Sequence, residues 1–211
     1  FNHEASAMRA AEGVMTAALG LEIPTAGGPG QGWDGLWFDE ENELFLRTRD
    51  VPGGVRLHYA VSPTVLPQTA EGQAGGADLS LHLDADLLVM ERATENLTVR
   101  ARRLRPLDWA DATPIAGRYH SDEIDASLVI EARDGAASIG FEGMLGLGPM
   151  ERMYPLAEDL WSVTSRRAMD AAPPGEWTLR IRRDEGGRVT WLTIGCWLAR
   201  RIEYSLSAGE Y

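Results

Sequence analysis

The side chains most often used in metal binding and nucleophilic catalysis are few and scattered in this chain. The four histidines are far apart, show no metal-ligand spacing, and are interpreted as surface residues: His3, His58, His82 and His120. Cys196 is the only cysteine, which excludes an intrachain disulfide and a cysteine-cluster metal site. The sequence therefore predicts no metal site and no cofactor.

The basic residues limit the chemistry further. All 20 of them are arginine, so Schiff-base chemistry, P-loop lysine chemistry and a Ser-x-x-Lys nucleophile pair are excluded from this chain. No Gly-x-Ser-x-Gly elbow is present. A Ser-His-Asp triad stays open, because its members assemble from distant positions. We expect no catalytic residue in this chain.

Acidic residues dominate the charge without forming an evident acid/base pair. The clusters Asp39-Glu40-Glu41 and Asp122-Glu123 lie between expected strands and are interpreted as solvated turns, since catalytic carboxylates must converge in a cleft. The net charge of −12 argues against nucleic acid and anionic membrane surfaces as partners. No apolar run reaches the roughly 18 residues that a membrane-spanning helix needs.

The seven tryptophans allow two interpretations. Trp37, Trp177 and Trp191 lie in or beside expected strands with apolar neighbours, which favours core packing. Two or more tryptophans exposed on one face would instead indicate a sugar-binding module, because sugars stack on exposed rings.

One loop combines a lone carboxylate with a stiff backbone. Residues 166–176 contain Asp170 among small residues, followed by Pro173, Pro174 and Gly175. Stiff loops on a rigid scaffold commonly carry function. A plain connection between strands is the alternative.

The elements that would position this loop are indicated by an internal repeat. Gly35-Leu36-Trp37 is followed by an acidic cluster, an apolar strand and a turn at Asp50. Gly117-Arg118-Tyr119 is followed by the same features and a turn at Asp134. The long interval predicts two copies of one small domain, with chance similarity as the alternative.

The apolar periodicity changes once along the chain. Residues 4–20 show the 3–4 spacing of a helix, and a Gly-rich linker follows over 21–32. From Trp33 onward apolar residues alternate with polar ones, the pattern of antiparallel strands with one buried and one wet face. Short strands with turn residues between them favour a small closed barrel or a sandwich. The expected domains are 33–104 and 115–211, separated by a linker over 105–114.

Together these features resemble a known family. Phe1-Asn2-His3-Glu4-Ala5 followed by a helix resembles the end of a penicillin-recognising serine hydrolase domain. The duplicated Gly-x-aromatic units and the segment 169–177 resemble the two C-terminal domains of bacterial D-aminopeptidase. The order of helix tail, first barrel, second barrel and Asp-bearing loop is the most specific part of the resemblance.

The resemblance implies an all-β fold of two consecutive, eight-stranded, lipocalin-like antiparallel barrels after one N-terminal helix. It also implies an upstream catalytic domain in the same protein, to which residues 1–20 belong and which carries the Ser-x-x-Lys nucleophile. The loop 166–176 would then reach that active site, exclude penicillin-like ligands and bind the amino group of a D-amino-acid peptide or amide through Asp170. The supporting loop residues would be Arg167, Met169, Ala171, Pro173 and Gly175.

Further expectations follow from the resemblance. Because the nucleophile domain is missing, this chain alone is expected to be inactive. A homodimer is expected, and a bacterial cytoplasmic location, with the periplasm as the alternative. Two rival functions come from other classes: a pair of lipocalin-like barrels that hold a small apolar ligand, and a sugar-binding module.

Overall fold

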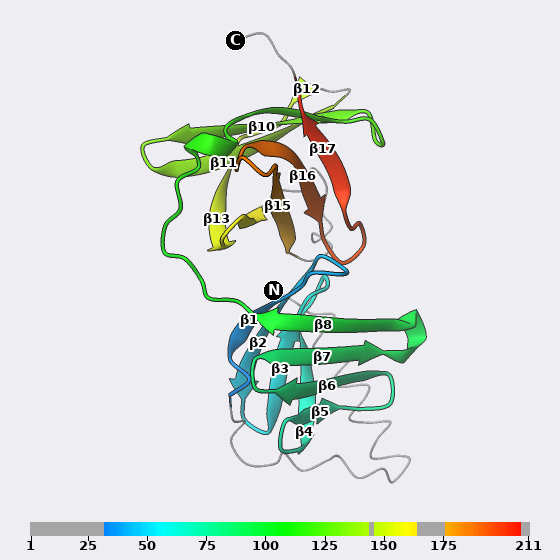
Figure 1. The fold of residues 1–211 in the computed structure, drawn as a ribbon. Helices are drawn as coiled ribbons and strands as arrows, with labels where there is room; N and C mark the ends of the chain where they lie inside the picture. Colours follow the sequence, from blue (N-terminus) through cyan, green and yellow to red (C-terminus); the bar gives the residue numbers. More distant parts are fainter. Residues whose placement is uncertain (1–31, 144–145, 164–175, 208–211) are drawn as a thin grey trace.

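The computed structural model describes residues 32–143, 146–163 and 176–207, and this part of the chain is all-β. Figure 1 shows two barrels stacked on each other and joined by one extended connection. The only helical segments described are two short 3-10 turns, Ala93–Glu95 and Thr113–Ile115. The helix expected over 4–20 lies outside the described residues. Within those residues no helix is long and apolar enough to cross a membrane.

The first barrel is a closed antiparallel sheet in which each strand pairs with the next along the chain. Pairing of its first strand with its last, with Trp37 opposite Arg103, completes the ring. Closure leaves no exposed strand edge. Its strands are β1 (Gly35–Asp39), β2 (Leu44–Val51), β3 (Gly54–His58), β4 (Thr64–Ala70), β5 (Gln73–Gly75), β6 (Leu79–Asp84), β7 (Leu87–Arg92) and β8 (Leu97–Arg103).

The second barrel is built in the same way, with one extra short strand. Its sheet closes through the pairing of β10 with β11, and β12 is attached to β11 outside the ring. The prediction of two eight-stranded antiparallel barrels is thereby confirmed. The strands are β9 (Gly117–Ser121), β10 (Ala126–Arg133), β11 (Ala136–Gly143), β12 (Gly146–Leu147), β13 (Glu151–Ala157), β14 (Leu160–Val163), β15 (Trp177–Arg183), β16 (Val189–Gly195) and β17 (Ile202–Leu206).

Both barrels begin with the same hairpin, as the internal repeat indicates. In β1 Trp37 lies opposite Leu46, and in β9 Tyr119 lies opposite Leu128. The turns after the second strands also correspond, because Gly53 and Gly135 have φ angles of 74° and 75°. Such a left-handed conformation favours glycine, which has no Cβ.

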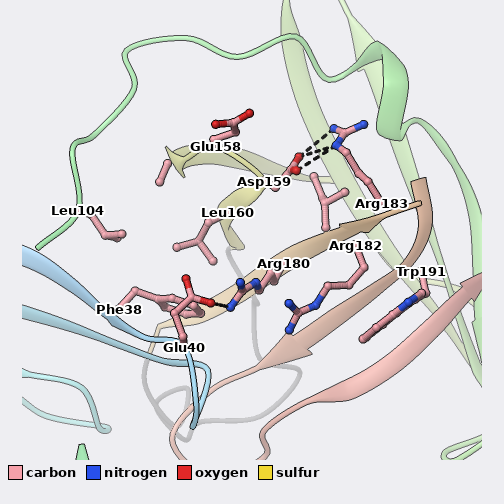
Figure 2. A pocket seen from close by; sticks show the side chains of 12 residues that line it. Phe38, Glu40, Leu104, Glu158, Asp159, Leu160, Arg180, Arg182, Arg183 and Trp191 are labelled. Atoms are coloured by element: carbon pink, nitrogen blue, oxygen red, sulfur yellow. Dashed lines mark hydrogen bonds and ion pairs between the residues drawn. The ribbon is translucent and has the colours of Figure 1, made fainter. Parts of the chain in front are cut away.

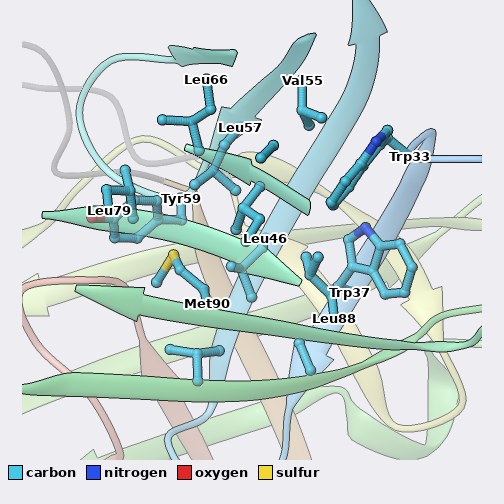
Figure 3. Packing of buried hydrophobic residues seen from close by; sticks show 14 of the residues in the cluster. Trp33, Trp37, Leu46, Val55, Leu57, Tyr59, Leu66, Leu79, Leu88 and Met90 are labelled. Carbon is cyan, nitrogen blue, oxygen red and sulfur yellow. The ribbon is translucent and has the colours of Figure 1, made fainter. Parts of the chain in front are cut away.

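Apolar side chains fill the interior of both barrels. In barrel 1 the core contains Trp37, as predicted, together with residues from the seven other strands and Trp33, which precedes β1 (Figure 3). In barrel 2 it contains Tyr119 and side chains from every strand of the ring. Cores packed in this way argue against the lipocalin-like alternative, in which the interior would hold an apolar ligand.

Thr48 connects two buried tryptophans of barrel 1 through its hydroxyl. The Trp37 indole N–H donates to Thr48 Oγ1 at 2.6 Å, and the hydroxyl donates to the Trp33 carbonyl oxygen. All three residues are buried. The hydroxyl therefore satisfies a donor and an acceptor that have lost access to water.

Replacing Thr48 by Val is expected to lower the free energy of unfolding by about 1–3 kcal/mol, because the buried Trp37 N–H loses its acceptor. Urea denaturation followed by tryptophan fluorescence measures this change. Thr48→Ser keeps the hydroxyl and should retain most of the stability. A serine variant as unstable as the valine variant would show that the methyl group, and not the hydroxyl, matters here.

Candidate functional site

The outward face of the first hairpin is buried against barrel 2. Phe38 and Phe45 lie opposite each other on β1 and β2 and point away from the core of barrel 1. Both are buried, and they pack with Leu156 and Leu160 of barrel 2. The expectation that this face is wet was therefore wrong. An apolar contact between the barrels takes the place of water.

Strand β15 carries the matching charged face of barrel 2. Leu179 and Ile181 point into the core of barrel 2, and Arg180 and Arg182 alternate with them. The two arginines reach across to carboxylates of the first hairpin in barrel 1. Arg180 pairs with Glu40, and Arg182 pairs with Glu43.

The two ion pairs differ in how far they are removed from water. The Glu43 side chain is 4% exposed, whereas the Glu40 side chain is 63% exposed. Burial, together with the neighbouring charge of Arg182, lowers the pKa of Arg180 from its ordinary value. Arg180 also lies over the Phe38 ring, 5.6 Å from its centroid. The contact between the barrels thus combines apolar packing with charge pairing.

A cleft of about 530 Å³ opens beside this contact (Figure 2). Among its lining residues Arg183 is bound by both carboxylate oxygens of Asp159, at 2.8–3.0 Å. The hydrogen bond to Asp159 is the main cause that raises the pKa of Arg183. The arginines of the cleft are therefore all paired with carboxylates, and its described lining includes no serine, cysteine or histidine. It provides no nucleophile from this part of the chain.

A second contact between the barrels involves Trp197, in the turn after β16. Its ring meets Tyr59 edge-on, with centroids 6.0 Å apart, and its indole N–H donates to Glu95 at 3.0 Å. Burial raises the pKa of Tyr59 from its ordinary value. Arg200, which follows in the same turn, donates to Asn42 of the first hairpin at 3.4 Å. Contacts at separate places restrict rotation of one barrel against the other.

The loop singled out in the sequence connects β14 to β15. Its ends are held by the pairing of Val163 with Trp177 in barrel 2. Glu176, immediately before β15, binds Arg47 of barrel 1 through two hydrogen bonds of 3.2 and 3.1 Å. His58 Nδ1 lies 3.7 Å from the same carboxylate. The loop therefore emerges where barrel 2 meets barrel 1.

Asp170 itself lies outside the described residues, as do the expected supporting residues of the loop. Its role and its position stay predictions. The supporting residues concerned are Arg167, Met169, Ala171, Pro173 and Gly175.

The histidines were only partly understood from the sequence. His82 is exposed, as expected. His58 is half-buried and faces Glu176, a contact with the other barrel that its interpretation as a surface residue did not foresee. His120 contacts Ser127 and Asp122. Among the described residues no group of histidine, cysteine and carboxylate side chains could hold a metal ion.

The acidic clusters separate into exposed and buried members. Glu40, Glu41 and the Asp122-Glu123 pair are exposed, in agreement with solvated turns. Asp39 is 2% exposed, so that interpretation was wrong for it. Its carboxylate accepts the backbone N–H groups of Glu41 and Arg100. Asp39 therefore holds the turn of the first hairpin against β8, a structural role.

The tryptophans do not form a sugar-binding face. Trp109 alone is highly exposed, at 64%, whereas Trp33, Trp37 and Trp161 are buried and Trp177, Trp191 and Trp197 are half-buried. The sugar-binding alternative requires at least two exposed rings on one face.

Two closed antiparallel barrels, one after the other along the chain, define a two-barrel β module. Comparison of the sequence with known families identifies it further. The family model described as D-aminopeptidase, domain B, matches residues 27–205. The chain belongs to this family.

Individual relatives agree with the family assignment. A D-aminopeptidase of Cereibacter sphaeroides strain KD131 is 54% identical over 205 residues, which cover 97% of this chain and 39% of the relative. A D-aminopeptidase of Brucella ovis is 38% identical over 207 residues, with the same two coverages. The chain thus spans about 39% of the length of the curated relatives that it matches.

Proposed function

We propose that this chain is the C-terminal, non-catalytic part of a D-aminopeptidase-like serine hydrolase that releases N-terminal D-amino acids from peptides. The observation that carries the proposal is the family match over residues 27–205, combined with relatives named D-aminopeptidase that are much longer. The composition agrees with a non-catalytic part, because the absence of lysine excludes a Ser-x-x-Lys nucleophile pair from this chain. The partner of the barrels is then a catalytic domain upstream in the same protein.

Within that enzyme, the loop 166–176 shapes the active site and recognises the amino group of the substrate. Asp170 is the carboxylate that meets the substrate ammonium. A charge-assisted hydrogen bond between the two is stronger than a neutral one, and more so where water is excluded. This contact would favour peptides with a free N-terminal D-residue over peptides that lack the amine.

The barrels give the loop a rigid base. Residues before and after the loop belong to paired strands, and Glu176 is bound to the neighbouring barrel. A loop held at such a junction keeps its ends fixed when substrate binds, which limits the entropy lost on binding. We place the enzyme in the bacterial cytoplasm, with the periplasm as the alternative, and we expect it to be a homodimer.

The isolated chain is expected to hydrolyse neither D-alanine amides nor penicillins, because it has no lysine to activate a serine nucleophile. Release of D-alanine from D-alanine p-nitroanilide measures this directly. The full-length protein, assayed in the same buffer, is the positive control. Reproducible turnover by the isolated chain, abolished by mutation of one of its serines, would contradict the proposal.

A further inference from the structure

We infer that Glu176 is a positioning residue for amine recognition, because its clamp on Arg47 fixes where the loop leaves barrel 2. The inference rests on the proposed function and adds to it a residue that does not touch the substrate. Glu176 stands at the C-terminal end of the loop that carries Asp170. Its partner belongs to the other barrel, so the loop end is tied to both barrels at once.

The contact between Arg47 and Glu176 fixes the orientation of the Glu176 carboxylate as well as its distance from Arg47. Arg47 Nε donates to one carboxylate oxygen of Glu176 at 3.2 Å, and Nη2 donates to the other at 3.1 Å. Two parallel hydrogen bonds fix the plane of the carboxylate, which a single contact would leave free to rotate. The guanidinium lies over the Phe45 ring, 5.7 Å from its centroid, so Arg47 is itself braced.

Two neighbouring strands of barrel 1 share in the clamp. Arg47 on β2 and His58 on β3 are directly opposite each other in the ladder. His58 Nδ1 lies 3.7 Å from the Glu176 carboxylate oxygen that also accepts from Arg47 Nε. Arg47 and His58, which contact Glu176, therefore both belong to the closed sheet of barrel 1. The contact does not depend on one long side chain.

The clamp supplements the hydrogen bonds that hold the loop within barrel 2. The pairing of Val163 with Trp177 sets the separation of the loop ends. This pairing does not fix how the adjoining ends of β14 and β15 are tilted relative to barrel 1. Other contacts must do so, and Glu176 supplies one of them immediately beside the loop. Small misplacements matter in an active site, since an error of about 1 Å can lower a rate a hundredfold.

The charges around Glu176 also make it possible to distinguish a positioning role from direct binding of the substrate. Arg47 neutralises Glu176 and occupies both of its oxygens. If Glu176 itself bound the substrate amine, removal of Arg47 would free the carboxylate and improve amine binding. If Glu176 positions the loop, removal of either partner causes the same loss.

The experiment uses the full-length enzyme and two substrates, D-alanine p-nitroanilide and the anilide of the same acyl group without the amine. The readout is the ratio of the two kcat/KM values. Glu176→Gln and Arg47→Met are each expected to lower this ratio about tenfold through misplacement of Asp170. The double variant should be no worse than either single variant, because both break one contact. Arg47→Lys should recover part of the ratio, since it keeps the charge without the two parallel bonds.

Asp159→Asn is the matched control. It weakens another bidentate pair, between Asp159 and Arg183, at the opposite end of β15. The ratio should stay unchanged in this variant. Thermal unfolding should change little in all variants, because the clamp is partly exposed and such pairs contribute about 0–1 kcal/mol.

Asp170→Ala, assayed beside these variants, separates failure of the inference from failure of the proposed function. If Asp170→Ala lowers the ratio and Glu176→Gln does not, the positioning role is wrong and the proposed function stands. If Asp170→Ala leaves the ratio unchanged, the proposed function fails and the inference fails with it. An increase of the ratio in Arg47→Met, with a decrease in Glu176→Gln, would overturn positioning in favour of direct amine binding.

Discussion

In the full-length protein, Asp170→Ala is expected to lower kcat/KM for substrates with a free N-terminal D-residue about a hundredfold or more. This corresponds to about 3 kcal/mol, within the range for removing one partner of a buried, hydrogen-bonded charge pair. The physical reason is that the substrate ammonium would be desolvated without a compensating carboxylate. Steady-state kinetics with D-alanine p-nitroanilide measures the loss.

A substrate that lacks the amine provides the control for this variant. Its kcat/KM should change little, because only the ammonium loses its partner. Asp170→Asn keeps the size of the side chain and removes its charge, and it should behave like the alanine variant. Equal losses for the two substrates would refute amine recognition by Asp170.

Arg182→Ala is expected to lower the free energy of unfolding of this chain by about 3 kcal/mol, because it leaves the buried Glu43 carboxylate without its partner. Glu43 is 4% exposed, and Arg182 reaches it from the other barrel. Contact between the barrels should weaken in the same step. Chemical denaturation followed by fluorescence and by circular dichroism measures the stability and tests whether the barrels still unfold together.

Arg180→Ala is the matched control for this prediction. Arg180 lies two residues away on the same face of β15, and its side chain is somewhat less exposed than that of Arg182. Its partner Glu40 is exposed, so the loss should be about 1 kcal/mol or less. Adding Glu43→Gln to Arg182→Ala should recover part of the stability, because an amide is less costly to bury than a charge. Similar losses in the two arginine variants would contradict this explanation.

Much of the fold could be predicted from the sequence. The alternation of Leu44 and Leu46 with Phe45 and Arg47 predicts a strand with one face in a core, and the structure has that strand. The repeat of Gly35 at Gly117 predicts a second domain of the same kind, and each glycine begins the first strand of a barrel. Each of these features depends on residues that are close together in the sequence, so the sequence pattern is enough to predict it.

The environment of the outward faces could not be predicted. The alternation of apolar and polar residues shows that the side chains of Phe45 and Arg182 point away from the cores of their own barrels. It does not show whether they face water or another barrel. Arg182 meets Glu43 at a separation of 139 positions, which no local pattern encodes. Asp39 was misjudged for the same reason, since one of its partners is the backbone of Arg100 on a distant strand.

The candidate site likewise has features that could be predicted from the sequence and features that could not. The prolines of the loop and its lone carboxylate are visible in the sequence, and they led to the prediction of a functional loop. The clamp between Glu176 and Arg47 was missed, because Glu176 resembles any charged residue at the start of a strand. A search for unpaired charges beside the loop could have proposed Glu176, but its partner depends on how the barrels stack.

The position of Asp170 relative to a bound amine is the most direct test of amine recognition by this loop. The measurement is a crystal structure of the full-length protein with a D-amino acid in its active site. We expect a carboxylate oxygen of Asp170 about 2.7–3.2 Å from the ammonium nitrogen of the ligand. An amine bound only by residues of the catalytic domain, with Asp170 turned away into solvent, would contradict it.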